Sequence, residues 1–156
     1  MRFLYLLRHA RAASAPSTSS DFDRPLTAEG RAQATRVGQV IAAEGLTEVA
    51  VITSPALRAR ETTELVLAGA GLSIAPRFEP RIYDAERATL LSLISEVDDA
   101  YRTLILVGHN PGVENLLRFF TREVHPVPPA ALSKIRLEID NWSEVNSSGA
   151  HLEWLV

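Results

Sequence analysis

The feature that most constrains the fold is the alternation of short aliphatic runs with amphipathic helical patterns. The runs are FLYLL at residues 3–7, VAVI at residues 49–52 and TLILV at residues 103–107. Short uninterrupted runs of this kind are typical of strands buried on both faces of a parallel sheet. Strands separated by helical segments in turn indicate an α/β domain.

Four stretches have helical spacing. In the first, Thr27 is a plausible N-cap, Val37, Val40 and Ile41 share one face, and Gly45 can end the helix. In the second, Ser54 is the expected cap. In the fourth, Asn110 is the expected cap. A proline follows the cap in the second and in the fourth stretch, at the first helical position. The stretches are LTAEGRAQATRVGQVIAAEG (26–45), SPALRARETTELVLAG (54–69), DAERATLLSLISEV (84–97) and NPGVENLLRFF (110–120).

The C-terminal part favours two strands, at residues 133–139 and 151–155, which can pair as an antiparallel hairpin. We therefore expect a three-layer α/β/α sandwich with a mostly parallel central sheet, and one domain over residues 1–156. Residues 13–20 (ASAPSTSS) are rich in small polar side chains and are expected to form a surface loop.

Composition excludes several classes of function. The net charge of −3 does not favour a nucleic-acid or membrane-surface binder, and the absence of cysteine excludes a thiol nucleophile or thiolate metal site. No stretch reaches the roughly 20 apolar residues of a membrane span, and the run after Met1 is too short for a signal peptide. A cytoplasmic location is therefore the default expectation.

Basic and imidazole side chains follow all three aliphatic runs. Arg8 and His9 follow the first, Arg58 lies in the first turn of the helix after the second, and His109 follows the third. A cation in a first helical turn is disfavoured by the helix dipole unless an anion binds there. Because parallel strands present their carboxyl ends at one edge of a sheet, these residues are predicted to converge on one anion, most plausibly a phosphoryl group.

Each of these motifs, taken alone, can have a purely structural role. The Arg–His pair can be a structural pair, the Ser-Pro sequence a common helix start, and GHNPG a tight turn with a surface histidine. Their occurrence together favours the anion site. The combination LLRHA (6–10), TSPALRARETTE (53–64) and LVGHNPG (106–112) resembles the histidine phosphatase superfamily, which is also called phosphoglycerate mutase-like. DRPLTAEGRAQA (23–34) and the small size resemble its SixA-type phosphohistidine phosphatase branch.

The resemblance implies a role for each matching residue. His9 matches the nucleophile that becomes transiently phosphorylated, Arg8 and Arg58 match the phosphate-binding arginines, and His109 matches the second histidine of the phosphate pocket. Ala10 departs from the glycine of the best-known family signature, and an alanine fits there unless the backbone needs a positive φ. No cofactor and no metal are expected.

A phosphate ester usually needs a general acid for its leaving oxygen. Glu79, Asp84 and Glu86, within FEPRIYDAE (78–86), are the candidate proton donors. Asp84 also has an alternative role as the cap of the following helix. A phosphohistidine substrate relaxes the need for an acid, because its P–N bond is labile and a protonated imidazole leaves readily.

Nearby polar residues have structural interpretations. Arg24 can reach the rim of the pocket or pair with Asp23, and the pair is favoured. Glu61 is expected to pair with an arginine of its own helix or beneath the pocket. Thr53 and Ser54 are candidate donors to phosphate, although capping explains Ser54 as well.

The sequence thus predicts a metal-independent phosphatase that acts through a phosphohistidine intermediate on a phosphohistidine-bearing protein. One alternative is a phosphatase of small phosphomonoesters, and another is a phospho-ligand binding module without turnover. Mutase activity is less favoured, because it requires an enclosed pocket. No nucleic-acid or membrane partner is expected.

Overall fold

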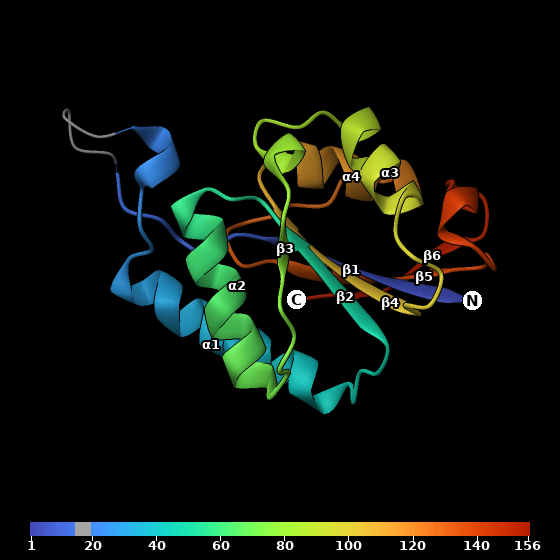
Figure 1. The fold of residues 1–156 in the computed structure, drawn as a ribbon. Coiled ribbons are helices and arrows are strands. Elements are labelled where there is room, and N and C mark those ends of the chain that lie inside the picture. The colour runs from blue at the N-terminus through green and yellow to red at the C-terminus, as the bar shows by residue number, and fades with distance from the viewer. Residues whose placement is uncertain (15–19) are drawn as a thin grey trace.

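The computed structural model describes residues 1–14 and 20–156, and its centre is one six-stranded sheet (Figure 1). Most of the loop expected at residues 13–20 lies outside the described residues. The strand order is β3-β2-β4-β1-β5-β6. The strands are β1 (Arg2–Arg8), β2 (Val49–Thr53), β3 (Arg77–Phe78), β4 (Thr103–Gly108), β5 (Leu132–Leu137) and β6 (Ala150–Leu155).

The sheet is mostly parallel, as predicted. β4 lies between β1 and β2 and is parallel to both, and β2 is parallel to β3. β5 pairs antiparallel with β1 and with β6, which confirms the C-terminal hairpin. Because β1, β4 and β2 run in the same direction side by side, the residues that follow them meet at one edge of the sheet.

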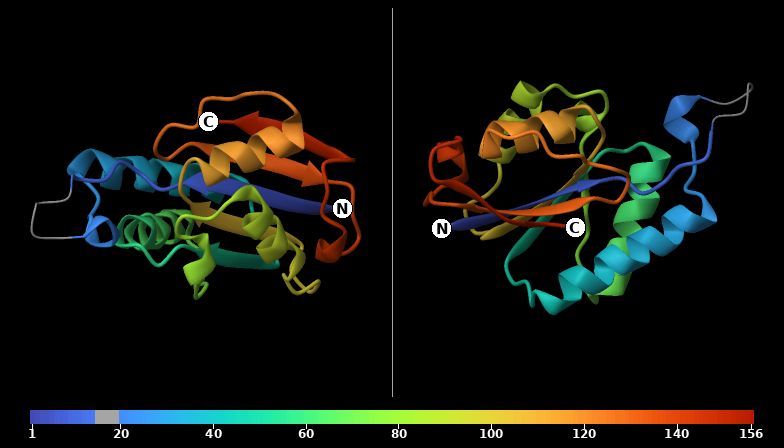
Figure 2. Two further views of the ribbon diagram at one scale, coloured as in Figure 1. Left: turned by 90° about the horizontal axis from the view of Figure 1, so that it is seen from above. Right: turned by 180° about the vertical axis from the view of Figure 1, so that it is seen from behind.

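Four α-helices cover the two faces of the sheet and complete the predicted three layers (Figures 1 and 2). Helices α1 and α2 lie together on one face, and α3 and α4 lie on the other. The helices are α1 (Ala28–Ala43), α2 (Leu57–Ala70), α3 (Arg87–Ser95) and α4 (Gly112–Thr121), and single turns of 3-10 helix occur at Asp21–Asp23, Pro80–Ile82 and Trp142–Glu144.

Two separate hydrophobic clusters explain why β1 is apolar from Phe3 to Leu7. Side chains of a strand alternate between the faces of its sheet. Leu4 and Leu6 therefore pack with α3 and α4, while Tyr5 and Leu7 pack with α1 and α2. Both faces are covered, so no position in the middle of β1 can be polar without losing buried apolar contact.

The helix starts differ in part from the predictions. Thr27 caps α1 as expected, and its hydroxyl accepts a hydrogen bond from the Gly30 amide. Ser54 does not directly precede a helix, because α2 begins at Leu57; its Oγ instead accepts from the Ala56 amide within the preceding turn. The helix α2 thus begins three residues after Ser54, and Ser54 stabilises the turn that leads into the helix.

The starts of α3 and α4 are also later than predicted. Asp84 is not the cap of α3, because that helix begins at Arg87 and Asp84 adopts a left-handed φ of 55°. Pro111, not Asn110, directly precedes α4, although the Asn110 side chain still accepts from the Glu114 amide. Asp84 and Asn110 belong to loops at the sheet edge rather than to regular helix starts.

Two further details were not anticipated. Val40 lies on the exposed side of α1, so only Val37 and Ile41 of the expected apolar face are buried. The two-residue strand β3 (Arg77–Phe78) has no hydrophobic run of its own and follows from its pairing with Ile52 and Thr53.

No helix among residues 1–14 and 20–156 is long and apolar enough to span a membrane.

Candidate active site

The predicted anion-binding residues lie together at the carboxyl edge of the sheet. His9 follows β1, His109 follows β4, and Arg58 is the second residue of α2, which follows β2. The centroids of the two imidazole rings are 5.1 Å apart, and the Arg58 Nε lies 3.3 Å from the His9 Nε2. Three segments that are far apart in the sequence therefore come together at one site, which we call the pocket.

The hydrogen bonds of His9 define its tautomer. Its Nδ1 lies 2.7 Å from the Ala10 carbonyl oxygen, which can only accept a hydrogen bond, so Nδ1 carries the proton. The Nε2 atom then holds a lone pair, and it accepts the hydrogen bond from the Arg58 Nε. An imidazole nitrogen with a lone pair is the form of histidine that acts as a nucleophile.

The backbone around His9 is held from both sides. The His9 amide donates to the Gly108 carbonyl, and its carbonyl accepts from the Ala130 amide, each at 3.0 Å. The Ala10 amide donates to the Thr62 hydroxyl at 3.0 Å, and Ala10 is not among the residues with positive φ. Alanine at this position therefore costs no backbone strain, and the departure from the family signature does not disturb the site.

Both imidazoles are neutral at physiological pH. Burial lowers the pKa of His9 to about 4, and the neighbouring cations Arg58, Arg8 and Arg24 lower it further, against the opposing effect of the Ala10 hydrogen bond. Burial likewise lowers the pKa of His109 to about 3, with contributions from His9 and Arg58. The arginines thus contribute to the lowered pKa values of both histidines, but desolvation is the larger cause.

Two buried polar atoms of the pocket have no hydrogen-bond partner among the residues that the structure describes. They are the Arg8 Nε and the His109 Nδ1. The Arg8 Nη1 donates to the Val127 carbonyl, and burial lowers the pKa of Arg8. The His109 Nε2 lies 2.7 Å from the Ser54 Oγ. Because unpaired buried polar groups are costly, such atoms point to a ligand that completes them.

Asp21, which the sequence did not indicate as part of the site, binds the Arg58 guanidinium. The Arg58 Nη2 lies 3.1 Å from the Asp21 Oδ2, and its Nη1 donates to the Asp21 carbonyl. The Tyr83 hydroxyl donates to the same carboxylate oxygen at 2.6 Å. Hydrogen bonds from Tyr83 and Arg24, with the charge of Arg58, hold the pKa of Asp21 well below its usual range.

Two predicted ion pairs have other partners. Arg24 pairs with Asp21 at 2.9 Å rather than with Asp23, since the turn at Asp21–Asp23 places the carboxylate three residues back beside the guanidinium. Glu61 pairs with Arg31 of α1 at 2.6 Å, not with its own helix, and also accepts from the Leu26 amide. Glu61 thus joins α2 to the segment before α1 rather than contacting the pocket.

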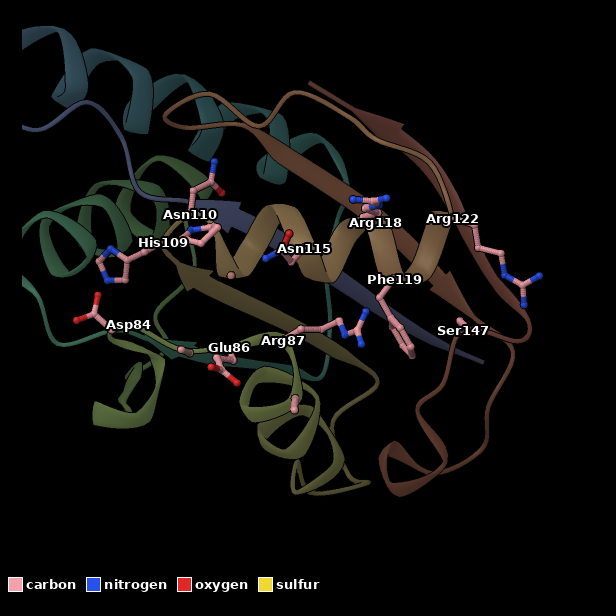
Figure 3. Close-up of a pocket in the computed structure, with 14 residues that line it drawn as sticks. Asp84, Glu86, Arg87, His109, Asn110, Asn115, Arg118, Phe119, Arg122 and Ser147 are labelled. Carbon is pink, nitrogen blue, oxygen red and sulfur yellow. The ribbon is translucent and has the colours of Figure 1, made fainter.

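The three candidate proton donors occupy different environments. Glu79 is bound by Arg81 and Arg77, and its pKa is lowered chiefly by the hydrogen bond from Arg81. Asp84 and Glu86 are exposed and line a groove that begins at His109, with Asp84 drawn beside the imidazole in Figure 3. Of the three, Asp84 is therefore the carboxyl best placed to approach a bound phosphoryl group.

Comparison with known proteins identifies the class. The family model of the histidine phosphatase superfamily (branch 1) matches residues 4–86, and the chain belongs to this superfamily. An uncharacterized protein of Mycobacterium tuberculosis is 37% identical over 105 residues, and one of a Picosynechococcus strain is 37% identical over 114 residues. These matches cover 67% and 69% of this chain, but only 63% and 66% of the length of the two relatives.

Solved structures that are similar to this chain include proteins of the SixA-type branch. It matches a protein assigned as the phosphohistidine phosphatase SixA of Agrobacterium tumefaciens with a TM-score of 0.85 and 28% identity, covering 99% of this chain and 97% of that one. A second protein so assigned, from Nakamurella multipartitia, matches with a TM-score of 0.81 and 28% identity, covering 99% and 95%.

Proposed function

We propose that this protein is a phosphatase that forms a phosphoryl intermediate on His9 and acts on phosphohistidine in a protein. One observation supports this most strongly. The His9 Nε2 has its lone pair free of a proton and lies 3.3 Å from a guanidinium nitrogen, and the nearby Arg8 Nε and His109 Nδ1 have no hydrogen-bond partner among the described residues. A neutral nucleophile surrounded by donors for oxygen atoms suits phosphoryl transfer.

In the first step, the His9 Nε2 attacks phosphorus, a new P–N bond forms, and the bond between phosphorus and the leaving imidazole breaks. The leaving imidazole carries its proton on its other ring nitrogen, so it departs as a neutral group and the released nitrogen keeps the bonding pair as a lone pair. Arg8 and Arg58 bind the phosphoryl oxygens and stabilise the charge that develops on them. The His109 Nδ1 becomes a further donor if the Ser54 hydroxyl donates to Nε2, because His109 is then neutral and protonated at Nδ1.

In the second step, a water molecule attacks phosphorus, the bond to Nε2 breaks, and inorganic phosphate leaves. The Nδ1–H of His9 remains bonded to the Ala10 carbonyl throughout, so Nε2 regains its lone pair and the enzyme returns to its starting state. This sequence uses only side chains of the pocket and water.

The preference for phosphohistidine over an ester rests on the leaving group. Among residues 1–14 and 20–156, no carboxyl group is hydrogen-bonded to His9 or His109. An alkoxide needs a proton donor, whereas a protonated imidazole does not. The names of the two SixA-type neighbours agree with this choice of substrate.

The test is mass spectrometry of the protein after brief exposure to a phosphohistidine peptide and, separately, to an aryl phosphate, with phosphate release followed in parallel. We expect a phosphoryl adduct on His9 and release of phosphate, both lost in His9→Ala. The matched control is His151→Ala, because His151 is exposed and pairs only with Glu138 among the described residues. Phosphate binding without an adduct or release would instead favour the binding module.

A second candidate function, hydrolysis of small phosphate esters, is favoured by the position of Asp84 beside His109 (Figure 3). Replacement by asparagine keeps the shape and tolerates the left-handed φ of 55°. If Asp84→Asn lowers hydrolysis of an alkyl phosphate at least tenfold while Glu86→Gln does not, Asp84 acts as a proton donor. That result would favour a small phosphate ester as the substrate. Equal rates for both variants and the wild type leave phosphohistidine as the better substrate.

A further inference from the structure

A groove leads away from the phosphate pocket along α4. It has a volume of about 890 Å³, and its walls come from α4, from the start of α3 and from Ser147 in the loop before β6 (Figure 3). His109 lies at one end and Arg122 near the other. The groove is continuous with the proposed catalytic site, so a substrate bound at His109 can extend into it.

Three arginines line this groove: Arg87, Arg118 and Arg122. None of them has an ion pair with a carboxylate or a side-chain hydrogen bond within the described parts of the chain, 1–14 and 20–156. By contrast, Arg77, Arg81 and Arg136 all pair with glutamates of this chain. The groove therefore holds guanidinium groups whose capacity for bidentate carboxylate binding is unused.

Arg87 is held on the groove wall by an aromatic side chain. Its guanidinium carbon lies 5.1 Å from the ring centroid of Phe119, which also lines the groove. Arg87 is the first residue of α3, where the helix dipole disfavours a positive charge. This is the same unfavourable placement as that of Arg58, and a bound anion would relieve it in the same way.

The charges are unevenly distributed along the groove. Asp84 and Glu86 lie towards His109, whereas Arg118 and Arg122 lie towards the far end (Figure 3). A complementary occupant therefore carries its phosphoryl group at His109, neutral or basic groups next to it, and carboxylates farther along.

The length of the groove separates small from large substrates. From Gly112 to Arg122 the chain advances ten residues, and a helix rises 1.5 Å per residue, so the two ends are roughly 15 Å apart. An extended peptide covers this length with about four or five residues. A small phosphate ester bound at His109 does not reach Arg118 or Arg122.

We propose that Arg118 and Arg122, with Arg87 beside them, bind carboxylate side chains of a protein substrate, about three to five residues from its phosphohistidine. This inference rests on the proposed function and adds to it a rule for substrate choice. The far end of the groove acts in binding and not in the chemical step, so it lowers KM for acidic substrates and leaves kcat unchanged.

The test compares two phosphohistidine peptides of equal length, with glutamates or with glutamines three to five residues on either side of the phosphohistidine. We expect the wild-type protein to prefer the glutamate peptide roughly 3- to 30-fold in kcat/KM, through KM, as for one or two exposed ion pairs. The preference should shrink as salt is raised. In the double variant Arg118→Glu/Arg122→Glu the ratio should fall to one or below.

The matched control is Arg36→Glu. Arg36 is an exposed arginine of α1, on the opposite layer, so the replacement changes the charge as much as each of the two groove replacements does, without altering the groove. This control should keep the wild-type ratio. Because each ratio is taken within one variant, a general loss of activity does not imitate the effect.

The outcomes separate the two proposals. Equal hydrolysis of both peptides by the wild type, or a preference that persists in the double variant, overturns the acidic-segment proposal and leaves the phosphohistidine phosphatase standing. Hydrolysis of aryl phosphate but of neither peptide overturns phosphohistidine as the substrate, and the acidic-segment proposal with it, but keeps the phosphatase and favours a small ester substrate. Failure to hydrolyse peptides and aryl phosphate alike overturns the proposed function itself and, with it, the substrate rule.

Discussion

The phosphate pocket and the C-terminal hairpin both contain arginine and histidine, but they use them in opposite ways. In the hairpin of β5 and β6, Arg136 pairs with Glu153 at 2.7 Å and with Glu138 at 3.0 Å, and His151 pairs with Glu138. In the pocket, the Arg8 Nε and the His109 Nδ1 are buried without partners in the described chain.

The difference shows how a charged side chain with a structural role can be distinguished from one that binds a ligand. A partly exposed cation with two carboxylate neighbours, such as Arg136, is satisfied by its own chain and adds little to stability. A buried cation beside two neutral histidines costs desolvation and is tolerated where a ligand completes it. Partnering and burial, rather than residue type, distinguish the two regions.

The largest expected effect comes from removing one pocket arginine. Arg8→Met should lower kcat/KM for the phosphohistidine peptide roughly 10²- to 10³-fold, as does the loss of one donor to a developing oxyanion. Stability should change by no more than about 1 kcal/mol, because a single hydrogen bond is lost and burial of the charge is relieved. The Val127 carbonyl keeps its bond from the Asn110 side chain. Steady-state kinetics and urea unfolding measure the two effects.

The counterpart in the hairpin is Arg136→Met. It should leave kcat/KM within twofold of the wild type and shift Tm by less than about 3 °C. A large loss of activity in this variant, or a large loss of stability in Arg8→Met, would contradict the division between the two regions.

A smaller effect is expected from acid. The folded-state pKa values of about 4 for His9 and about 3 for His109 lie below the value of about 6.5 expected in the unfolded chain. Below pH 6.5 the unfolded chain therefore takes up protons that the folded chain does not, and stability falls as the pH decreases towards 4. At pH 5 each histidine should lower the free energy of unfolding by about 2 kcal/mol.

Urea unfolding at pH 7 and pH 5 measures this contribution. In His109→Gln the loss of stability between the two pH values should be about 2 kcal/mol smaller than in the wild type. His151→Gln, in the exposed hairpin, is the control and should behave as the wild type does. An unchanged loss in His109→Gln would show that His109 does not titrate as its burial implies.

The smallest effect concerns Asp21, whose carboxylate lies 3.1 Å from the Arg58 guanidinium. Asp21→Asn removes a negative charge that competes with phosphate for Arg58, so inorganic phosphate should inhibit about threefold more strongly. Asp23→Asn is the matched control, because Asp23 accepts a hydrogen bond from Ser20 and contacts no arginine in the described residues. Weaker inhibition in Asp21→Asn would mean that Asp21 orients Arg58 rather than competing for it.

The sheet and the core of the site could be predicted because their signals are local. An uninterrupted aliphatic run such as residues 3–7 can only be buried on both faces, and the parallel order then brings His9 and His109 together. The convergence of the site needed only that Arg8 and His9 come at the end of one apolar run, His109 at the end of another, and Arg58 in the first turn of the helix after a third, which is visible in the sequence.

The remaining features depend on tertiary contacts without periodicity. Asp21 lies in an irregular segment and contacts Arg58 and Tyr83, which are 37 and 62 residues away in the sequence. No local sequence pattern therefore predicts these contacts. β3 exists only because Arg77 and Phe78 extend the edge of β2. The groove arginines come from two helices whose mutual placement follows from packing, not from spacing.

The position of β1 in the sheet has a consequence for how the chain acquires activity. Phe3 pairs with Thr103 and Leu7 with Leu132, so β1 is synthesised about a hundred residues before either neighbour. Such non-local pairing slows folding, since a long loop must close before the contacts form. On the ribosome, the strand that presents His9 stays unpaired until β4 and β5 emerge. His9, the proposed nucleophile, is therefore made about a hundred residues before the strands that complete its surroundings.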